Sequence, residues 1–158
     1  DGVALLVTSL PVFAPEMFMT VVLKNPLRTK QLQQGLAQLG EEGAIQVFKP
    51  DAGGNMLLGA VGQLQFEVVA HRLEHEYGVK ARIMGSSFNL ARWVTSEDPN
   101  ELKKFMDANA HRVALDAVDA PTLLVDHSAT LRAVEQQWPK IKFHALREHA
   151  GLVFQSKM

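Results

Sequence analysis

The chain has 158 residues, a hydrophobic content of 47%, a charged content of 21% and a formal net charge of −1. This composition is typical of folded protein and excludes a disordered segment, and the length allows one ordinary domain or two very small ones. The near-zero net charge excludes a global electrostatic field that would attract RNA or anionic lipid. Any nucleic-acid contact must therefore be a local patch.

The sequence contains no cysteine, which excludes disulfides and cysteine metal sites and favours a reducing, cytoplasmic location. The apolar run 3–13 is too short to span a bilayer and lacks basic residues before it, so we expect neither a membrane partner nor a secretory signal. The chain begins at Asp1 rather than Met. We therefore expect residues 1–15 to be a linker from a missing preceding domain.

Residues 16–84 show alternating strand and helix signals. A β-rich stretch ends at Asn25-Pro26, which is typical of a helix start with Asn at the N-cap and Pro at the first helical position. Leucines follow at helical spacing, and Gly40 or Gly43 is expected to close the helix. The remaining elements are two hairpin strands, a helix and a last strand, at 44–48, 56–58, 63–77 and 79–83.

The resulting order β-α-β-β-α-β is that of a ferredoxin-like unit, and it repeats in residues 85–149. A strand at 88–94, a helix capped near Asp98, two strands within 112–125, a helix ending at Pro139 and a strand at 141–143 make up the second unit. We therefore predict an α+β fold with two consecutive ferredoxin-like units. Residues 150–158 form a tail to which no role is assigned.

The helix at 63–77 carries a second apolar stripe. Leu64 and Val68 lie opposite the main apolar face, and His71 and His75 continue their stripe. A helix on a single sheet needs one apolar stripe. We therefore expect the second unit to cover the N-terminal half of this helix, so that both units pack as one body.

The stretch His71-Arg72-Leu73-Glu74-His75 matches H-x-x-E-H, the inverted pattern of zinc peptidases. Two histidines one helical turn apart could reach one Zn²⁺, with Glu74 as the base. The pattern is short, and no third ligand is evident. The simpler interpretation, which we favour, is the polar side of an amphipathic helix, and we expect no metal site.

No nucleotide site is evident either. The sequence lacks G-x-x-x-x-G-K-[ST], so no glycine loop with a lysine can hold phosphates. The glycines of Gly59-Ala60-Val61-Gly62 are better explained by close packing of a strand against the following helix. We expect no catalytic residue and no cofactor in this chain.

Several separated motifs carry a family resemblance. The stretch from Gly59 to Glu67 resembles the opening of a helix in domain III of elongation factor G. The match to class II peptide chain release factors is more extensive and runs from Phe13 to His149. It includes the segments 13–18, 23–27, 30–32, 41–48, 58–62, 91–94 and 147–149. An acidic residue of that family is replaced here by Asn25, at a cap position where either residue works.

The resemblance implies that this chain is the C-terminal, non-catalytic domain of a translational GTPase. The parent protein would hold GTP and Mg²⁺ in a missing domain, followed by a β-barrel. It would use GTP to dissociate class I release factors from the ribosome, and the present piece would contact the ribosome or the other domains. The expected partners are ribosomal RNA and protein, the GTPase and β-barrel domains, and, indirectly, a class I release factor.

Candidate contact residues come from the charges. Lys24, Arg28 and Lys30 cluster at the first helix start, where cations oppose the helix dipole, so a phosphate-contacting patch competes with an ordinary solvated cluster. Lys80 and Arg82 allow the same two interpretations, with a weaker case for a phosphate contact. Arg92 and Trp93 could stack for packing or present a platform to a partner. Three residues after the last strand could form a salt bridge at the C-terminus or face a partner: Arg147, Glu148 and His149.

Two other functions remain open at this point. One is a free-standing ferredoxin-like module that binds a small ligand or forms oligomers. The other is the zinc peptidase of His71, Glu74 and His75. The upstream reading frame discriminates the first, because a P-loop there would indicate a GTPase. A metal assay discriminates the second.

Overall fold

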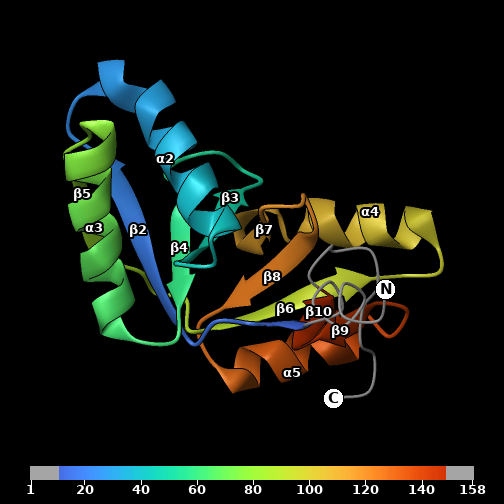
Figure 1. Ribbon diagram of the computed structural model, residues 1–158. Helices are drawn as coiled ribbons and strands as arrows, with labels where there is room; N and C mark the ends of the chain where they lie inside the picture. The colour runs from blue at the N-terminus through green and yellow to red at the C-terminus, as the bar shows by residue number, and fades with distance from the viewer. Residues whose placement is uncertain (1–10, 149–158) are drawn as a thin grey trace, which may run out of the picture.

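The computed structural model describes residues 11–148 and confirms the α+β fold with two β-α-β-β-α-β units (Figure 1). The first unit comprises β2 (Met17–Leu23), a short 3-10 helix η1 (Pro26–Arg28), α2 (Thr29–Glu41), β3 (Gln46–Pro50), β4 (Leu57–Ala60), α3 (Gln63–Tyr77) and β5 (Ala81–Gly85). The second comprises β6 (Leu90–Thr95), α4 (Pro99–Ala108), η2 (Ala110–Arg112), β7 (Val113–Leu115), β8 (Pro121–Val125), α5 (Ser128–Gln137) and β9 (Lys142–His144).

The predicted helix signals are confirmed by side-chain hydrogen bonds at the helix starts and by glycines with positive φ after the helix ends. The Asn25 side chain accepts a hydrogen bond from the Leu27 amide at 3.0 Å, and the Asp98 side chain accepts one from the Asn100 amide at 2.9 Å. These caps satisfy amides that have no partner inside the helix. Gly43, with φ of 81°, follows α2. Gly78, with φ of 67°, follows α3.

Three strands begin two residues later than predicted: β6, expected at 88–94, begins at Leu90, and the other two each follow a helix. The strands expected at 44–48 and 79–83 are β3 and β5, which begin at Gln46 and Ala81. The residues after each helix still belong to its C-terminal motif. The Ala44 amide donates back to the Leu39 carbonyl at 3.0 Å, and the Val79 amide donates to the Leu73 carbonyl at 2.9 Å. Satisfying the last helical carbonyls in this way delays the strands.

All strand pairs in the large sheet are antiparallel. The first unit has the order β5-β2-β4-β3, and the second has the matching order β9-β6-β8-β7. The two units join where β3 pairs with β7, Lys49 opposite Leu115 and Pro50 opposite Ala114, giving one eight-stranded sheet. The division between residues 84 and 85 stays a prediction, because this sheet is continuous across both units.

Three apolar clusters hold the molecule together. One lies between the first unit's sheet and helices α2 and α3, and a second lies between the second unit's sheet and helices α4 and α5. The third joins the helix-free faces of the two units and contains Phe18, Phe48, Leu57, Ala91, Ala114 and Leu124. The units therefore share a buried interface in addition to their strand pair, as expected for one packed body.

The expected cover over α3 is wrong. Leu64 is 69% exposed and Val68 is 44% exposed, so the second apolar stripe faces solvent. The physical reason is the β3–β7 pair, which places the second unit against the helix-free face of the first unit. Figure 1 shows α3 on the side of the first unit that faces away from the second unit.

A second, two-stranded sheet was not predicted. The strand β1 (Pro11–Phe13) pairs antiparallel with β10 (Leu146–Glu148), and the register places Val12 opposite Arg147. The Ala14 amide also donates to the Ala145 carbonyl at 2.8 Å. The first described strand therefore pairs with the last before the chain enters the first unit at β2.

Candidate functional site

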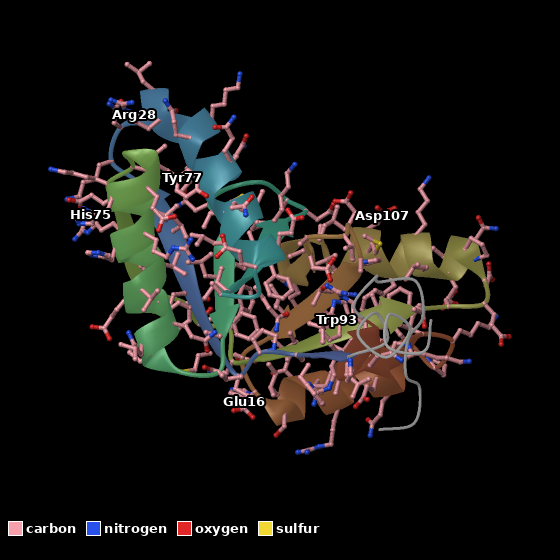
Figure 2. All side chains as sticks on the ribbon, in the orientation of Figure 1. Glu16, Arg28, His75, Tyr77, Trp93 and Asp107 are labelled. Atoms are coloured by element: carbon pink, nitrogen blue, oxygen red, sulfur yellow. The ribbon has the colours of Figure 1, made fainter. Side chains whose placement is uncertain are left out.

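The three predicted cations of the first helix start lie together at one end of the first unit. Lys24 follows β2, Arg28 ends η1 and Lys30 lies in the first turn of α2, and all three are exposed. Asn25 holds the η1 backbone in place through its bond to the Leu27 amide. Figure 2 shows Arg28 projecting from this end, away from both units. The sequence therefore places these cations on an ordered turn.

The strand register brings two more cations to the same end. Leu23 pairs with Ala81 and Val22 with Arg82, so Lys80 adjoins the end of β2, where Lys24 follows. Lys80 and Arg82 are both exposed. We call the five residues Lys24, Arg28, Lys30, Lys80 and Arg82 the basic tip. Sequence alternation singled out the last two separately, but the register that joins them to the others was missed.

The basic tip is not neutralised by the surrounding chain. Residues 17–40 contain no acidic residue, and neither do residues 77–96. Among the described residues, no tip cation forms a salt bridge. Leu27 lies between these cations in the sequence and is 86% exposed. The molecule therefore presents a local positive patch although its net charge is −1.

This arrangement does not favour helix stability. The first turn of α2 has no acidic residue, and Lys30 lies within it. Cations at a helix N-terminus oppose the macrodipole at a cost of about 0.3–1 kcal/mol each when exposed. Lys24 and Lys80 add like charges at adjoining strand ends, which is also unfavourable. Such a patch suits an anionic partner, for example a nucleic-acid backbone.

Trp93 and Arg147 belong to the interior, so their burial supports the packing and salt-bridge roles rather than contact with a partner. Trp93 is 1% exposed and Arg147 is 6% exposed. Both bind Asp116: the Trp93 Nε1 donates to Asp116 Oδ2 at 2.9 Å, and the Arg147 Nε donates to the same oxygen at 2.7 Å. Figure 2 shows Trp93 inside the second unit.

The aromatic ring of Trp93 stacks with a different arginine from the one expected. The Arg147 guanidinium carbon lies 5.4 Å from the ring centroid. Arg92 is half-buried and donates from Nη1 to the Ala91 carbonyl at 2.7 Å. The reason is strand geometry, because neighbouring residues point to opposite faces of a sheet. Of the two predicted roles for Arg147, the structure supports the salt bridge.

Of the last two predicted contact residues, the structure describes only Glu148. Glu148 lies in β10 with its backbone opposite Pro11. His149 lies outside the described residues, as do the tail 150–158 and most of the expected linker, residues 1–10. The strand register does not bring Glu148 near the basic tip.

Asp116 is the residue that sequence reasoning missed. Besides Trp93 and Arg147, it accepts hydrogen bonds at Oδ1 from the Val118 and Ala120 amides, at 3.0 and 2.9 Å. Its side chain is 4% exposed. Hydrogen bonds and a paired cation are what a buried carboxylate requires. The available signal was the sequence Asp116-Ala117-Val118-Asp119, a turn in which Asp binds following amides.

His71, Glu74 and His75 lie on the exposed side of α3. The two imidazole rings are 4.1 Å apart between centroids. Across residues 11–148, no group of three or more His, Cys, Asp or Glu residues is arranged to hold a metal ion. The structure thus gives this motif no third ligand from the described residues.

The Gly59–Gly62 segment is explained by packing and capping. A Cβ on Gly59 would lie 2.5 Å from Pro15 Cγ, so the close approach requires glycine. Nothing lies within 4 Å of a Cβ on Gly62, which is the N-cap of α3. The Gln65 Oε1 accepts from the Val61 and Gly62 amides at 2.9 and 3.2 Å. The side chain of Gln65 is therefore the hydrogen-bond acceptor for both of these amides.

A cavity of about 630 Å³ lies where the two units meet. Its walls come from α2, β3, β1 and the turn 116–119, and they include Leu36, Val47, Val12 and Val118. Arg147 and Asp116 also reach its lining.

In the described part of the chain, no helix is both long and apolar enough to cross a membrane.

Comparisons with known proteins identify the family. The model of the family described as "Class II release factor RF3, C-terminal domain" matches residues 7–135. The proteins named "Peptide chain release factor 3" from Nitrosomonas eutropha and Nitrosomonas europaea are 62% and 63% identical over 99% of this chain. The one from Bordetella avium is 63% identical over 98%.

The chain spans 29% of the length of each of these three relatives. The matches confirm the predicted resemblance, both in the family and in the part of it that is represented. The match covers most of the chain, and the relatives share well over half of its residues. This chain belongs to the class II release factor RF3 family, whose C-terminal domain it represents.

Proposed function

We propose that this chain is the ribosome-contacting and coupling domain of a translation-termination GTPase that promotes GTP-dependent dissociation of class I release factors. Membership of the release factor 3 family supports translation termination as the process. The chain has no phosphate-binding loop in its sequence. GTP and Mg²⁺ are accordingly assigned to another domain of a longer protein, and this domain has no catalytic role.

The observation that carries the proposal is the unpaired positive charge of the basic tip. All five cations are exposed, and no described acidic side chain forms a salt bridge with them. Ribosomal RNA offers phosphates that such cations bind through counterion release. The positive patch therefore fits the phosphate-rich surface of a ribosome better than it fits a neutral small ligand.

The remaining partners follow from the same proposal. The GTPase and β-barrel domains of the same chain contact this domain, and class I release factors are affected through the ribosome. The protein works in the cytoplasm and needs no membrane. The coupling is of the docking kind, in which two packed bodies change their relative position between two states.

Calorimetry tests the division of roles. We expect no binding of GTP or GDP at micromolar concentration to this chain, and tight binding to the full-length release factor. A dissociation assay on ribosomes that carry a labelled class I factor should show acceleration by full-length protein and GTP, and a loss of it after Lys24→Glu with Arg82→Glu. Nucleotide binding to the present chain would overturn the assignment.

The two alternative functions have less support. A free-standing module is disfavoured because relatives that match over 99% of this chain are more than three times as long, the match being 29% of their length. A zinc peptidase has no third ligand among the described residues. Elemental analysis that found stoichiometric zinc, lost in His71→Ala, would revive it.

A further inference from the structure

The strand pair β1–β10 is too short to be stable alone. It comprises three register pairs, Pro11 with Glu148, Val12 with Arg147 and Phe13 with Leu146. An isolated two-stranded ribbon is marginal in water even when it is longer. Its stability must therefore come from side chains that attach it to the rest of the molecule.

Two side chains of β10 supply that attachment. Leu146 is 5% exposed and Arg147 is 6% exposed, so both enter the interior. Arg147 binds Asp116 of the β7–β8 turn at 2.7 Å and lies over the Trp93 ring of β6. Asp116 is in turn fixed by Trp93 and by two amides of its own turn. The last described strand is thus connected to the centre of the second unit.

The same contact reaches the first unit through β1. Val12 is the direct partner of Arg147, and the Phe13 carbonyl accepts from Gln46 Nε2 at 2.8 Å. Gln46 begins β3, the strand that joins the two units. The segment that leads into the domain is therefore attached to both units before β2 begins.

We propose that Asp116 and Arg147 form a latch that fixes the entering strand β1 to the second unit, so that domains before this one move together with it. The inference rests on the proposed function for the existence of those domains, and it names the residues that couple them to the ribosome contact. Arg147 is a positioning residue that acts through β10. Without its charge, β10 and β1 separate from the turn 116–119 together.

The test uses the full-length release factor, with cysteines outside these 158 residues replaced, since the chain itself has none. One spin label is placed in the preceding β-barrel domain, and the other at Lys103→Cys, an exposed position on α4. A reference pair, Gln34→Cys with Lys103→Cys, reports the arrangement of the two units. Pulsed electron resonance gives the distance distribution of each pair, and hydrogen exchange gives the protection of the Val12 amide and of the neighbouring Ala14 amide, which donates to the Ala145 carbonyl.

We expect Arg147→Met to broaden the distribution between the β-barrel and α4 while the reference pair keeps its width. The protection of the Val12 and Ala14 amides should fall by roughly a hundredfold or more, because a buried carboxylate loses its cation. Val12→Pro breaks the ladder without altering the ion pair and should broaden the same distribution. Arg147→Lys keeps a cation and should restore most of the protection.

A matched control removes an exposed ion pair of the same unit. Lys142 lies 3.8 Å from Glu97, and Lys142→Met should leave both distributions and the amide protection as in the wild type. Because Asp116 and Arg147 act as a pair, combining Asp116→Asn with Arg147→Met should add less than the sum of the single effects.

The proposal is overturned if Arg147→Met leaves the β-barrel distribution at wild-type width while Val12→Pro broadens it. It is also overturned if the reference pair broadens equally, because Arg147 would then support the whole second unit and not the entering strand. Neither readout involves a ribosome or GTP. A failure of the basic tip to bind ribosomes would therefore leave this result intact, and the converse holds as well.

Discussion

Asp116 receives four hydrogen bonds inside the second unit, from Trp93, Arg147 and the amides of Val118 and Ala120. Its two side-chain partners lie 23 and 31 positions away in the sequence. No local pattern reveals such a pairing, so the contact between Trp93 and Arg147 could not be predicted from the sequence. Arg92, the sequence neighbour of Trp93, was the expected stacking partner. Neighbouring strand residues point to opposite faces of a sheet, which excludes this contact.

The first prediction concerns this carboxylate. Asp116→Ala removes the buried carboxylate that binds Arg147 and Trp93, and breaking a buried ion pair in this way costs about 3–5 kcal/mol. Urea unfolding should show that loss as a lower midpoint. The control is Asp107→Ala, an exposed carboxylate on α4, which should change the free energy of unfolding by no more than about 0.5 kcal/mol. Equal effects of the two changes would contradict the role assigned to Asp116.

At the scale of elements, the helix pair α2–α3 depends on one glycine. A Cβ on Gly35 would lie 2.8 Å from Leu73 Cδ2 and 3.0 Å from Tyr77 Cδ2. Figure 2 shows Tyr77 between the two helices. The sequence predicted both helices from their caps and apolar spacing. It did not indicate this close approach, because a glycine inside a helix can also lie where no other helix contacts it.

The second prediction follows from that contact. Gly35→Val forces α2 and α3 apart and should destabilise the protein by about 1–3 kcal/mol, as overpacked cores do. Gln34→Val is the matched control, because Gln34 is the exposed neighbour in the same helix. Differential scanning calorimetry should show a clear fall in melting temperature for the first change. A fall of the same size for both would mean that helix propensity, and not packing, is responsible.

The third prediction is a pH dependence between the same helices. Arg72 on α3 binds Glu42, the C-cap residue of α2, at 2.8 Å and Glu76 at 2.7 Å. Hydrogen bonds from Arg72 hold the pKa of Glu42 and of Glu76 below the ordinary value of 4.5. A carboxylate with a depressed folded-state pKa contributes stability above its unfolded pKa and loses it as pH falls.

Arg72→Gln should therefore reduce the melting temperature slightly at pH 7, and the difference from wild type should vanish as the carboxylates become protonated at acidic pH. The effect is small because these side chains are exposed. A difference that persists unchanged at low pH would show that Arg72 acts through packing of its aliphatic stem and not through its charge.

At the scale of the whole molecule, the sequence predicted the order of elements twice over, because caps, turn glycines and apolar periodicity are local. It could not predict how the units meet. The β3–β7 junction rests on two register pairs, and nothing near Lys49 or Leu115 signals a partner. The exposed stripe of Leu64 and Val68 suggested the wrong cover for this reason. The basic tip could not be predicted as one patch for the same reason, because only the strand register places Lys80 next to Lys24.

The central claim is that the basic tip binds the ribosome, and it can be separated from stability. Arg28→Glu with Lys30→Glu should leave the melting temperature nearly unchanged or slightly raised, because acidic residues suit a helix N-terminus. The control is Lys103→Glu with Lys104→Glu, two exposed lysines on α4 that form no salt bridge with any described residue. Both double variants change the net charge equally.

The decisive measurement is ribosome affinity of the full-length protein as a function of salt concentration. Each phosphate contact that is lost should reduce the logarithmic salt slope by roughly one unit. We predict that the tip variant binds more weakly and with a flatter slope, while the α4 variant keeps most of the wild-type affinity and slope. If the tip variant matches the wild type in both, or if the α4 variant loses as much, the basic tip is a solvated surface and the account is contradicted.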